Sequence, residues 1–170
     1  MTSVETLTTF DEHDRKALAA LLRDAVETGA SVGYVMPINE AEIAAFWTGV
    51  FEDVALGRRA LFVGRADGEI IGSVQIEFAN KPNARHRAEV QKMLVHSTQQ
   101  RKGLGRQLML AAEQSARSNR RTLLVLDTES ASAGQHLYAS LGFVAAGEIP
   151  KFVIGTNGGW SPTTYMYKLL

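Results

Sequence analysis

The feature that most constrains the fold is a short glycine-containing loop, residues 100–105, between a predicted strand and a predicted helix. Backbone N–H groups at a helix start have no partner within the helix, and the helix dipole adds partial positive charge there. Gly103 and Gly105 would let an anion approach this backbone without a Cβ in the way. Three cationic side chains accompany them: Arg101, Lys102 and Arg106. The loop is therefore a candidate pyrophosphate site.

By itself the loop is only a weak indication of a pyrophosphate site, because an ordinary glycine-containing turn can have the same composition. The sequence lacks the Gly-x-x-x-x-Gly-Lys-Ser/Thr pattern of phosphate-binding loops and the Gly-x-Gly-x-x-Gly pattern of dinucleotide sites. The surrounding elements give the loop its weight. A strand precedes it, and a helix and a further strand follow it, within a unit that extends over about residues 88–127.

Hydrophobic periodicity, capping residues and turn residues predict a mixed α+β sheet with helices on both sides. Asn39 is a candidate helix cap, and Asp67-Gly68 predicts a tight hairpin. Gln91 and Lys92 are adjacent polar residues that interrupt a strand, which predicts a β-bulge. In chain order, the predicted elements are helices over 11–27 and 39–57, strands over 60–65, 69–78 and 88–96, a helix over 103–119, a strand over 122–126, a helix over 132–140, and strands over 143–147 and 163–169.

The composition excludes several classes of protein. A chain of 170 residues with 45% hydrophobic and 21% charged residues fits one globular domain, which we expect to span 1–170. No apolar run is long enough to cross a bilayer and no secretory signal is evident, so we expect a cytoplasmic protein. Eighteen basic residues balance eighteen acidic ones, which argues against nucleic-acid or membrane partners. The chain has no cysteine, which excludes an acyl-enzyme on a thiol.

Several motifs together resemble the Gcn5-related N-acetyltransferase (GNAT) superfamily. They are the strand before the loop, Gln-Arg-Lys-Gly-Leu-Gly at the helix start, Leu-Asp-Thr-Glu over 126–129, and His-Leu-Tyr-Ala-Ser-Leu-Gly-Phe over 136–143. Within the superfamily, nearly the whole chain is similar to tabtoxin resistance protein-like acetyltransferases. The stretches that carry this similarity are 29–33, 87–92, 103–109, 126–129 and 162–163.

The resemblance implies the GNAT fold: a mixed α/β protein with a mostly antiparallel, twisted sheet of about seven strands and helices on both faces. It also implies a splayed strand pair that holds acetyl-CoA as co-substrate, with no metal. The residues that it implies for cofactor binding are Met93, Leu94, Val95, Gln100, Arg101, Lys102, Gly103, Leu104, Gly105 and Arg106. One position departs from the pattern: many members carry asparagine where this chain has Ala131.

The resemblance also implies three residues at the reaction centre: Glu89, Asp127 and Tyr138. Acetyl transfer needs a neutral amine, and an α-amino group is only about 10% neutral at pH 7. Either carboxylate could accept the proton while the other orients the ammonium, and the sequence does not distinguish them. Tyr138 could protonate the departing thiolate. The alternatives are a strand-end carboxylate paired with Arg87 or Lys92 for Glu89, a turn or helix-capping residue for Asp127, and a core tyrosine for Tyr138.

The histidines are not spaced as a metal site, and we expect them to be structural or exposed. The expected function is acetyl-CoA-dependent N-acetylation of a small-molecule amine, by direct transfer in a ternary complex. The amine could be amino-acid-like or a β-lactam toxin of the tabtoxinine type. A non-catalytic acyl-CoA-binding module and a protein or peptide N-acetyltransferase remain as alternatives. The acceptor, a role in toxin resistance and homodimer formation are left open by the sequence.

Overall fold

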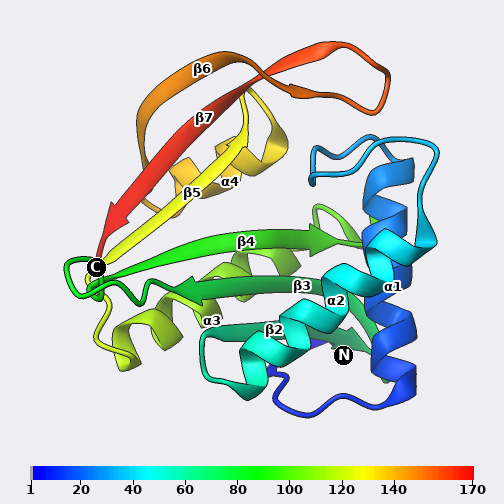
Figure 1. Ribbon diagram of the computed structural model, residues 1–170, viewed down its shortest axis with the longest axis horizontal. Helices are drawn as coiled ribbons and strands as arrows, with labels where there is room; N and C mark the ends of the chain where they lie inside the picture. The colour runs from blue at the N-terminus through cyan, green and yellow to red at the C-terminus, as the bar shows by residue number, and fades with distance from the viewer. Residues whose placement is uncertain (1) are drawn as a thin grey trace.

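The computed structural model describes residues 2–170, which form a seven-stranded sheet in the order β1-β2-β3-β4-β5-β7-β6 (Figure 1). Every neighbouring pair is antiparallel except β4 and β5, which run parallel. The strands are β1 Thr2–Thr6, β2 Arg59–Ala66, β3 Glu69–Phe78, β4 Arg87–Val95, β5 Leu123–Glu129, β6 Val144–Ile154 and β7 Trp160–Leu169. The predicted mixed, mostly antiparallel sheet is confirmed.

Helices begin where the sequence places capping side chains. The side chain of Asp11 accepts a hydrogen bond from the Asp14 N–H at the start of the first helix, and that of Asn39 accepts one from the Ala41 N–H at the start of the second. Ser132 caps the last helix in the same way. The helices are α1 Glu12–Glu27, α2 Glu40–Ala55, the single 3₁₀ turn Ser97–Gln99, α3 Leu104–Ser118 and α4 Ala133–Ser140.

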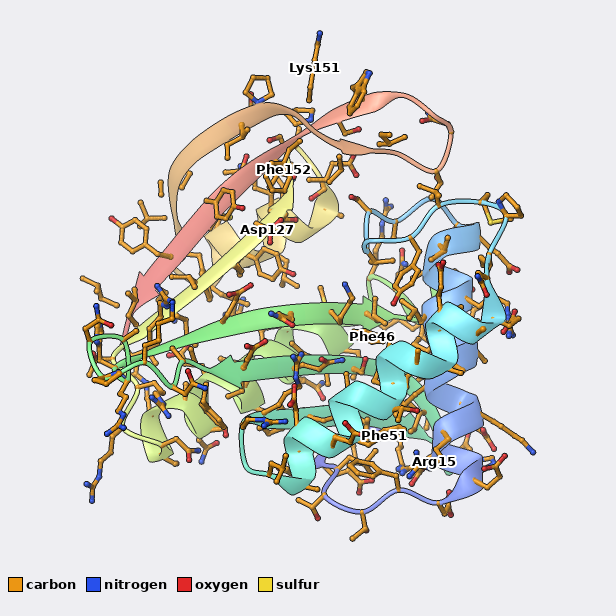
Figure 2. All side chains as sticks on the ribbon, in the orientation of Figure 1. Arg15, Phe46, Phe51, Asp127, Lys151 and Phe152 are labelled. Atoms are coloured by element: carbon orange, nitrogen blue, oxygen red, sulfur yellow. The ribbon has the colours of Figure 1, made fainter. Side chains whose placement is uncertain are left out.

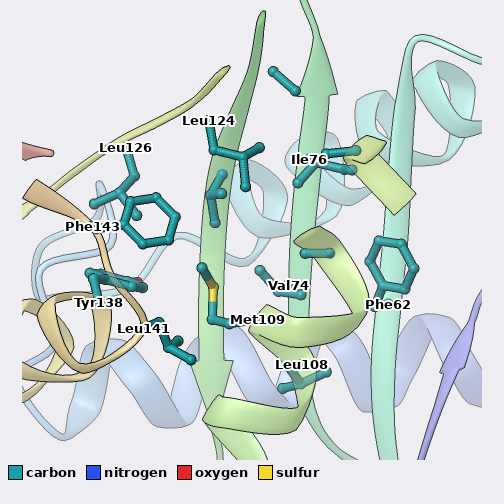
Figure 3. Packing of buried hydrophobic residues seen from close by; sticks show 14 of the residues in the cluster. Phe62, Val74, Ile76, Leu108, Met109, Leu124, Leu126, Tyr138, Leu141 and Phe143 are labelled. Atoms are coloured by element: carbon teal, nitrogen blue, oxygen red, sulfur yellow. The ribbon is translucent and has the colours of Figure 1, made fainter. Parts of the chain in front are cut away.

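Two hydrophobic clusters lie on opposite faces of the sheet. Helices α1 and α2 cover one face, where Leu18, Ile43 and Trp47 are buried. Helices α3 and α4 cover the other face, and Figure 3 shows Leu108 and Met109 of α3 packed among strand residues there. Trp47 is part of this core, since it is only 2% exposed. The sheet therefore lies between two packed layers of helices.

Turn residues adopt the positive φ angles that their positions require. Asp67 and Gly68 both have positive φ, at 51° and 87°, and join β2 to β3 in the predicted hairpin. Gly142 has φ 88° just after α4, as the left-handed ending of a helix requires. Among residues 2–170, no helix has the length and apolar character needed to span a membrane.

Some elements differ from the sequence prediction. Strand β1 was not predicted because it is short and contains one apolar residue, Val4, and its neighbour in the sheet is β2 alone. Strand β5 continues beyond 126 to Glu129 because β7 pairs with it over that length. Strands β6 and β7 are also longer than predicted, and β6 is exposed over nearly its whole length. Strand β6 lies at the edge of the sheet and contains Gly147 and Pro150, which interrupt an alternating hydrophobic pattern.

Candidate active site

A fork in the sheet opens the space for a site. Strands β4 and β5 pair only from Arg87 to Glu89 and from Leu123 to Val125. Beyond this point β4 stays paired with β3 and β5 stays paired with β7, so the two strands diverge (Figure 1). The predicted splayed strand pair is confirmed. Glu89 lies at the last pair of the parallel ladder, and Asp127 lies two residues beyond its partner Val125.

The predicted bulge in β4 is also present. Ser73 pairs with Leu94 and Gln75 with Gln91, so β4 carries one extra residue between these pairs. Lys92 is at φ 46°, in the left-handed region. Consecutive side chains here reach the same face: Gln91 contacts Arg59, and the Lys92 Nζ lies 5.4 Å from the ring centroid of Phe46 in α2. A regular strand would place these two side chains on opposite faces.

The fork contains a cavity of about 890 Å³. Its wall is formed by β4, the 99–106 region, β5, α4, the 30–33 loop and part of β6. Figure 2 places Asp127 and Phe152 on the β5 and β6 side of the fork and Phe46 on α2. The predicted site residues that line the cavity are Glu89, Met93, Leu94, Val95, Gln100, Arg101, Gly103, Leu104, Gly105, Arg106, Asp127 and Tyr138. Lys102 is the exception, since its ammonium instead donates to the Thr98 carbonyl and the Gln99 side chain.

The start of α3 has the features of an anion site. Gly103 is at φ 87°, and Gln107 donates the first helical hydrogen bond, to the Gly103 carbonyl. The N–H groups of residues 103–106 donate to no acceptor within the described part of the chain. A Cβ on Gly105 would lie 3.2 Å from the Leu137 side chain, so the backbone is closely approached there. Four free N–H groups and two nearby arginines fit a pyrophosphate.

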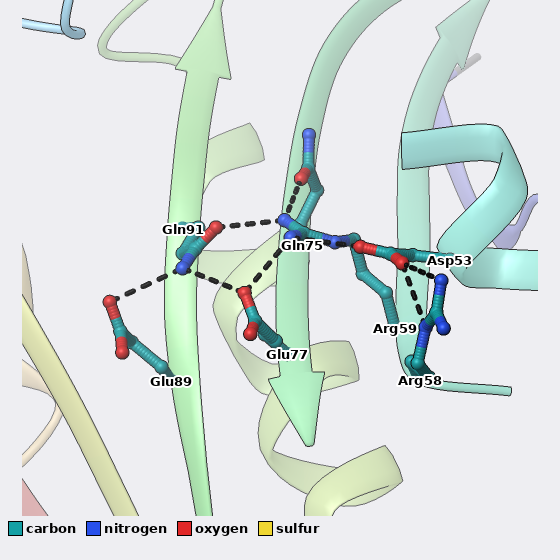
Figure 4. A network of polar contacts seen from close by, with 7 residues as sticks. All are labelled: Asp53, Arg58, Arg59, Gln75, Glu77, Glu89 and Gln91. Atoms are coloured by element: carbon teal, nitrogen blue, oxygen red, sulfur yellow. Dashed lines mark hydrogen bonds and ion pairs between the residues drawn. The ribbon is translucent and has the colours of Figure 1, made fainter. Parts of the chain in front are cut away.

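A part-buried polar network holds Glu89 (Figure 4). The Gln91 amide donates to the carboxylates of Glu89, at 3.2 Å, and Glu77, at 3.1 Å. The Arg59 guanidinium donates to the side-chain oxygens of Gln75, at 2.7 Å, and Gln91, at 2.8 Å. It also donates to Glu77, at 2.9 Å. Glu89 has no ion pair with Arg87 or Lys92, so the alternative of a paired strand-end carboxylate is not what the structure has.

Replacing Arg59 with methionine is expected to destabilise the protein. Its side chain is 10% exposed, and its loss leaves the fully buried Gln75 without its partner. Because Glu77 is half exposed, we expect a loss of about 2–3 kcal/mol in the free energy of unfolding, below the range for a fully buried pair. The melting temperature should fall by roughly 5–10 °C, as measured by circular dichroism.

The neighbouring Arg58→Met variant is the matched control. Arg58 pairs with Asp53 at 2.8 Å, but its side chain is 52% exposed. Exposed ion pairs contribute about 0–1 kcal/mol, so the melting temperature should change little. Equal losses in the two variants would contradict a special role for Arg59.

Asp127 and Tyr138 lie near one another on the other side of the fork. Asp127 is an exposed residue within β5, and Ser132 caps α4, so the alternative of a capping aspartate is not what the structure has. Tyr138 is 7% exposed and packs against Phe143, so it is part of the core as well as the cavity wall. Burial, and next the negative charge of Asp127, raise the pKa of the Tyr138 hydroxyl to about 12. That hydroxyl is therefore a proton donor at neutral pH.

Several groups around the fork were not predicted from the sequence. Strand register brings Arg59 and Gln75 together. The bulge brings Lys92 to the cavity wall, and the sequence indicated the bulge but not this position of the side chain. His96 lies 3.7 Å from Asp24, and the His136 ring contacts the Ser132 carbonyl. Among residues 2–170, no three histidine, aspartate or glutamate side chains are grouped as a metal site.

Comparisons with known proteins agree with this architecture. The family model described as an acetyltransferase (GNAT) domain matches residues 57–145. An uncharacterized N-acetyltransferase in the hisH-hisA intergenic region of Azospirillum brasilense is 32% identical over 164 residues, covering 92% of each chain. The L-amino acid N-acyltransferase MnaT of Escherichia coli strain K12 is 30% identical over 156 residues, covering 90% of this chain and 87% of its own.

Solved structures share the fold over the whole chain. The structure of yncA from Salmonella typhimurium with its cofactor acetyl-CoA has a TM-score of 0.82 at 23% identity, covering 100% of this chain and 94% of that one. The family model spans more than half of the chain, and the two relatives are aligned over nine tenths of it. The chain thus belongs to the GNAT family of acetyl-CoA-dependent N-acetyltransferases.

Proposed function

We propose that this N-acetyltransferase acetylates the amine of a small, amino-acid-like molecule in a ternary complex with acetyl-CoA. One observation carries the proposal: a single cavity joins a helix start with four free N–H groups to the carboxylates of Glu89 and Asp127 and to Tyr138. The relative whose name describes an L-amino acid N-acyltransferase supports the same acceptor class. The 30–33 loop and β6 both line the cavity, which favours a small acceptor over a protein surface.

In this proposal the cofactor lies along β4 and ends at α3. The N–H groups of residues 103–106 bind the pyrophosphate, with Arg101 and Arg106 beside it. The segment Met93–Val95 lies along the pantetheine arm. When bound, acetyl-CoA supplies an acetyl thioester, whose transfer to an amine releases the CoA thiol. The Lys102 ammonium donates to carbonyl groups of its own loop, so we assign it to shaping the loop.

Three side chains handle the protons. Glu89, held by Gln91 at the vertex of the fork, accepts the proton that the ammonium must lose before the nitrogen can attack. Asp127, on the facing strand, orients the ammonium. Tyr138 holds a proton for the sulfur anion that departs, and its raised pKa keeps that proton in place until then. We assign the base to Glu89 because Gln91 fixes its carboxylate, whereas no hydrogen bond from residues 2–170 fixes Asp127.

The test is a steady-state measurement of CoA release with a panel of amines. The panel contains L-amino acids, their carboxamides, a tabtoxinine-type β-lactam, and peptides with a free N-terminus or a lysine. We expect L-amino acids to give the highest kcat/KM, and plots against both substrates to intersect, as a ternary complex requires. Faster acetylation of peptides would overturn the small-molecule assignment. Tight CoA binding without acetylation of any amine would instead indicate a non-catalytic module.

A further inference from the structure

Lys92 is a cationic residue of the cavity wall that lies near Glu89 and away from the loop at the start of α3. The cationic residues that line the cavity are Lys92, Arg101 and Arg106, and the two arginines belong to the loop at the start of α3. Lys92 comes from the bulge in β4, on the same face as Gln91 and the network that holds Glu89. The proposed reaction centre and this ammonium are therefore parts of one wall of the cavity.

Lys92 forms no ion pair with any carboxylate among residues 2–170. Its ammonium makes no hydrogen bond or ion pair with any group from Thr2 to Leu170. It lies 5.9 Å from the ring centroid of Tyr34 and 5.4 Å from that of Phe46, and both rings are half buried. A Cβ on Gly33 would lie 3.3 Å from the ammonium, so the loop closes over it. Aromatic rings compensate a half-buried cation only in part, so the site favours an anion from outside.

We propose that Lys92 binds the carboxylate of the acceptor, so that the preferred substrates are molecules with an amine and a carboxylate, as in α-amino acids. Lys92 and Glu89 are three residues apart on one strand, roughly 10 Å of backbone, and their side chains converge on one cavity. A zwitterion bridges them, with its ammonium at Glu89 and its carboxylate at Lys92. This inference rests on the proposed function and adds the residue that selects the substrate class.

The charges and burial around Lys92 favour the binding of an anion from outside the protein. Burial lowers the pKa of the Lys92 ammonium, and the positive charge of Arg59 lowers it further, whereas Asp127 acts in the opposite direction. A bound carboxylate would stabilise the charged form of Lys92 and offset the cost of its burial. Binding at this position is therefore expected to depend on the charge of the ligand rather than on its shape.

The test compares two ligands that differ in the carboxylate alone, without requiring turnover. N-acetyl-L-leucine and N-acetyl-L-leucinamide are titrated by calorimetry into the protein saturated with CoA. In the wild type, the carboxylate form should bind more tightly by about 10- to 100-fold, the range of a charge-assisted hydrogen bond. Lys92→Met should remove this preference, and Lys92→Arg, which keeps the charge, should retain part of it. Lys16→Met, on the exposed face of α1, is the control and should leave the preference intact.

The same three variants are then measured with L-leucine and L-leucinamide as acceptors. Lys92→Met should lower kcat/KM for L-leucine about 10- to 100-fold and change that for L-leucinamide less than about threefold. Equal losses for both acceptors, or equal binding of both N-acetyl ligands by the wild type, would overturn the role of Lys92. Failure of the proposed function is a different result: neither acceptor is acetylated, whereas the calorimetric preference still decides the role of Lys92.

Discussion

Replacing Glu89 with glutamine is expected to lower kcat/KM for an α-amino acceptor by about 10²- to 10⁴-fold at pH 7, the usual contribution of a general base. The amide keeps the size of the side chain and can still contact Gln91, but it cannot accept the proton of the ammonium. About 90% of an α-amino group is protonated at pH 7. The loss should therefore shrink as the pH rises through the pKa of the amine, and initial rates from pH 6 to 10 would measure this change.

The control for this variant is Glu69→Gln, on the exposed part of β3, far along the strand from the fork. It removes one negative charge from the same sheet and should leave the rate unchanged. A wild-type to Glu89→Gln ratio below about threefold at pH 7 would contradict the assignment of the base. A large ratio that stays constant with pH would indicate that Glu89 acts after the amine has lost its proton.

Removing the Tyr138 hydroxyl, in Tyr138→Phe, is expected to lower kcat by about 10²-fold. Its hydroxyl donates to no group among residues 2–170, so the change leaves no unpaired partner and should cost little stability. Because the pKa of Tyr138 is raised to about 12, the hydroxyl stays protonated from pH 6 to 10. The ratio of wild-type to variant kcat should therefore be constant over this range, unlike the ratio for Glu89→Gln.

The stability of the protein gives a second measurement of the same group. A folded-state pKa above that of the unfolded chain means that the stability from the neutral hydroxyl is present below about pH 10 and is lost as the pH rises towards 12. Tyr138→Phe should flatten this alkaline decline in melting temperature. Tyr167→Phe, a partly exposed tyrosine on β7, is the control and should change neither property. A pH-dependent kcat ratio for Tyr138→Phe would indicate an ordinary tyrosine pKa.

Much of the framework could be predicted from the sequence because local chemistry determines it. Asp11 and Asn39 cap helices with their own side chains, and Asp67-Gly68 adopts the positive φ angles that a tight hairpin needs. The bulge was predictable because two adjacent polar residues interrupt an alternating strand. These features depend on neighbours within a few residues, which are visible in the sequence itself.

The remainder depends on neighbours that are distant in the sequence. The fork exists because β4 and β5 share only three pairs, and no local pattern gives the length of a parallel ladder. Arg59 reaches Glu77 and Gln91 across two strand pairings, so its role follows from register. Strand β1 forms because β2 provides an edge for a polar segment. Tyr138 is both a core residue and a candidate acid, which the sequence presented as alternatives.

The bulge in β4 provides a position at which substrate preference can change during evolution. On either side of Lys92 the strand keeps its alternation: Gln91 and Leu94 face the α1 and α2 layer, and Met93 and Val95 face the α3 layer. Residue 92 is thus an additional position: its ammonium lies beside Tyr34 and Phe46, which pack against the α1 and α2 cluster, but its side chain belongs to neither buried cluster. Replacing its side chain changes what the cavity offers an acceptor without repacking the core. Substrate preference can therefore evolve at this position separately from the fold.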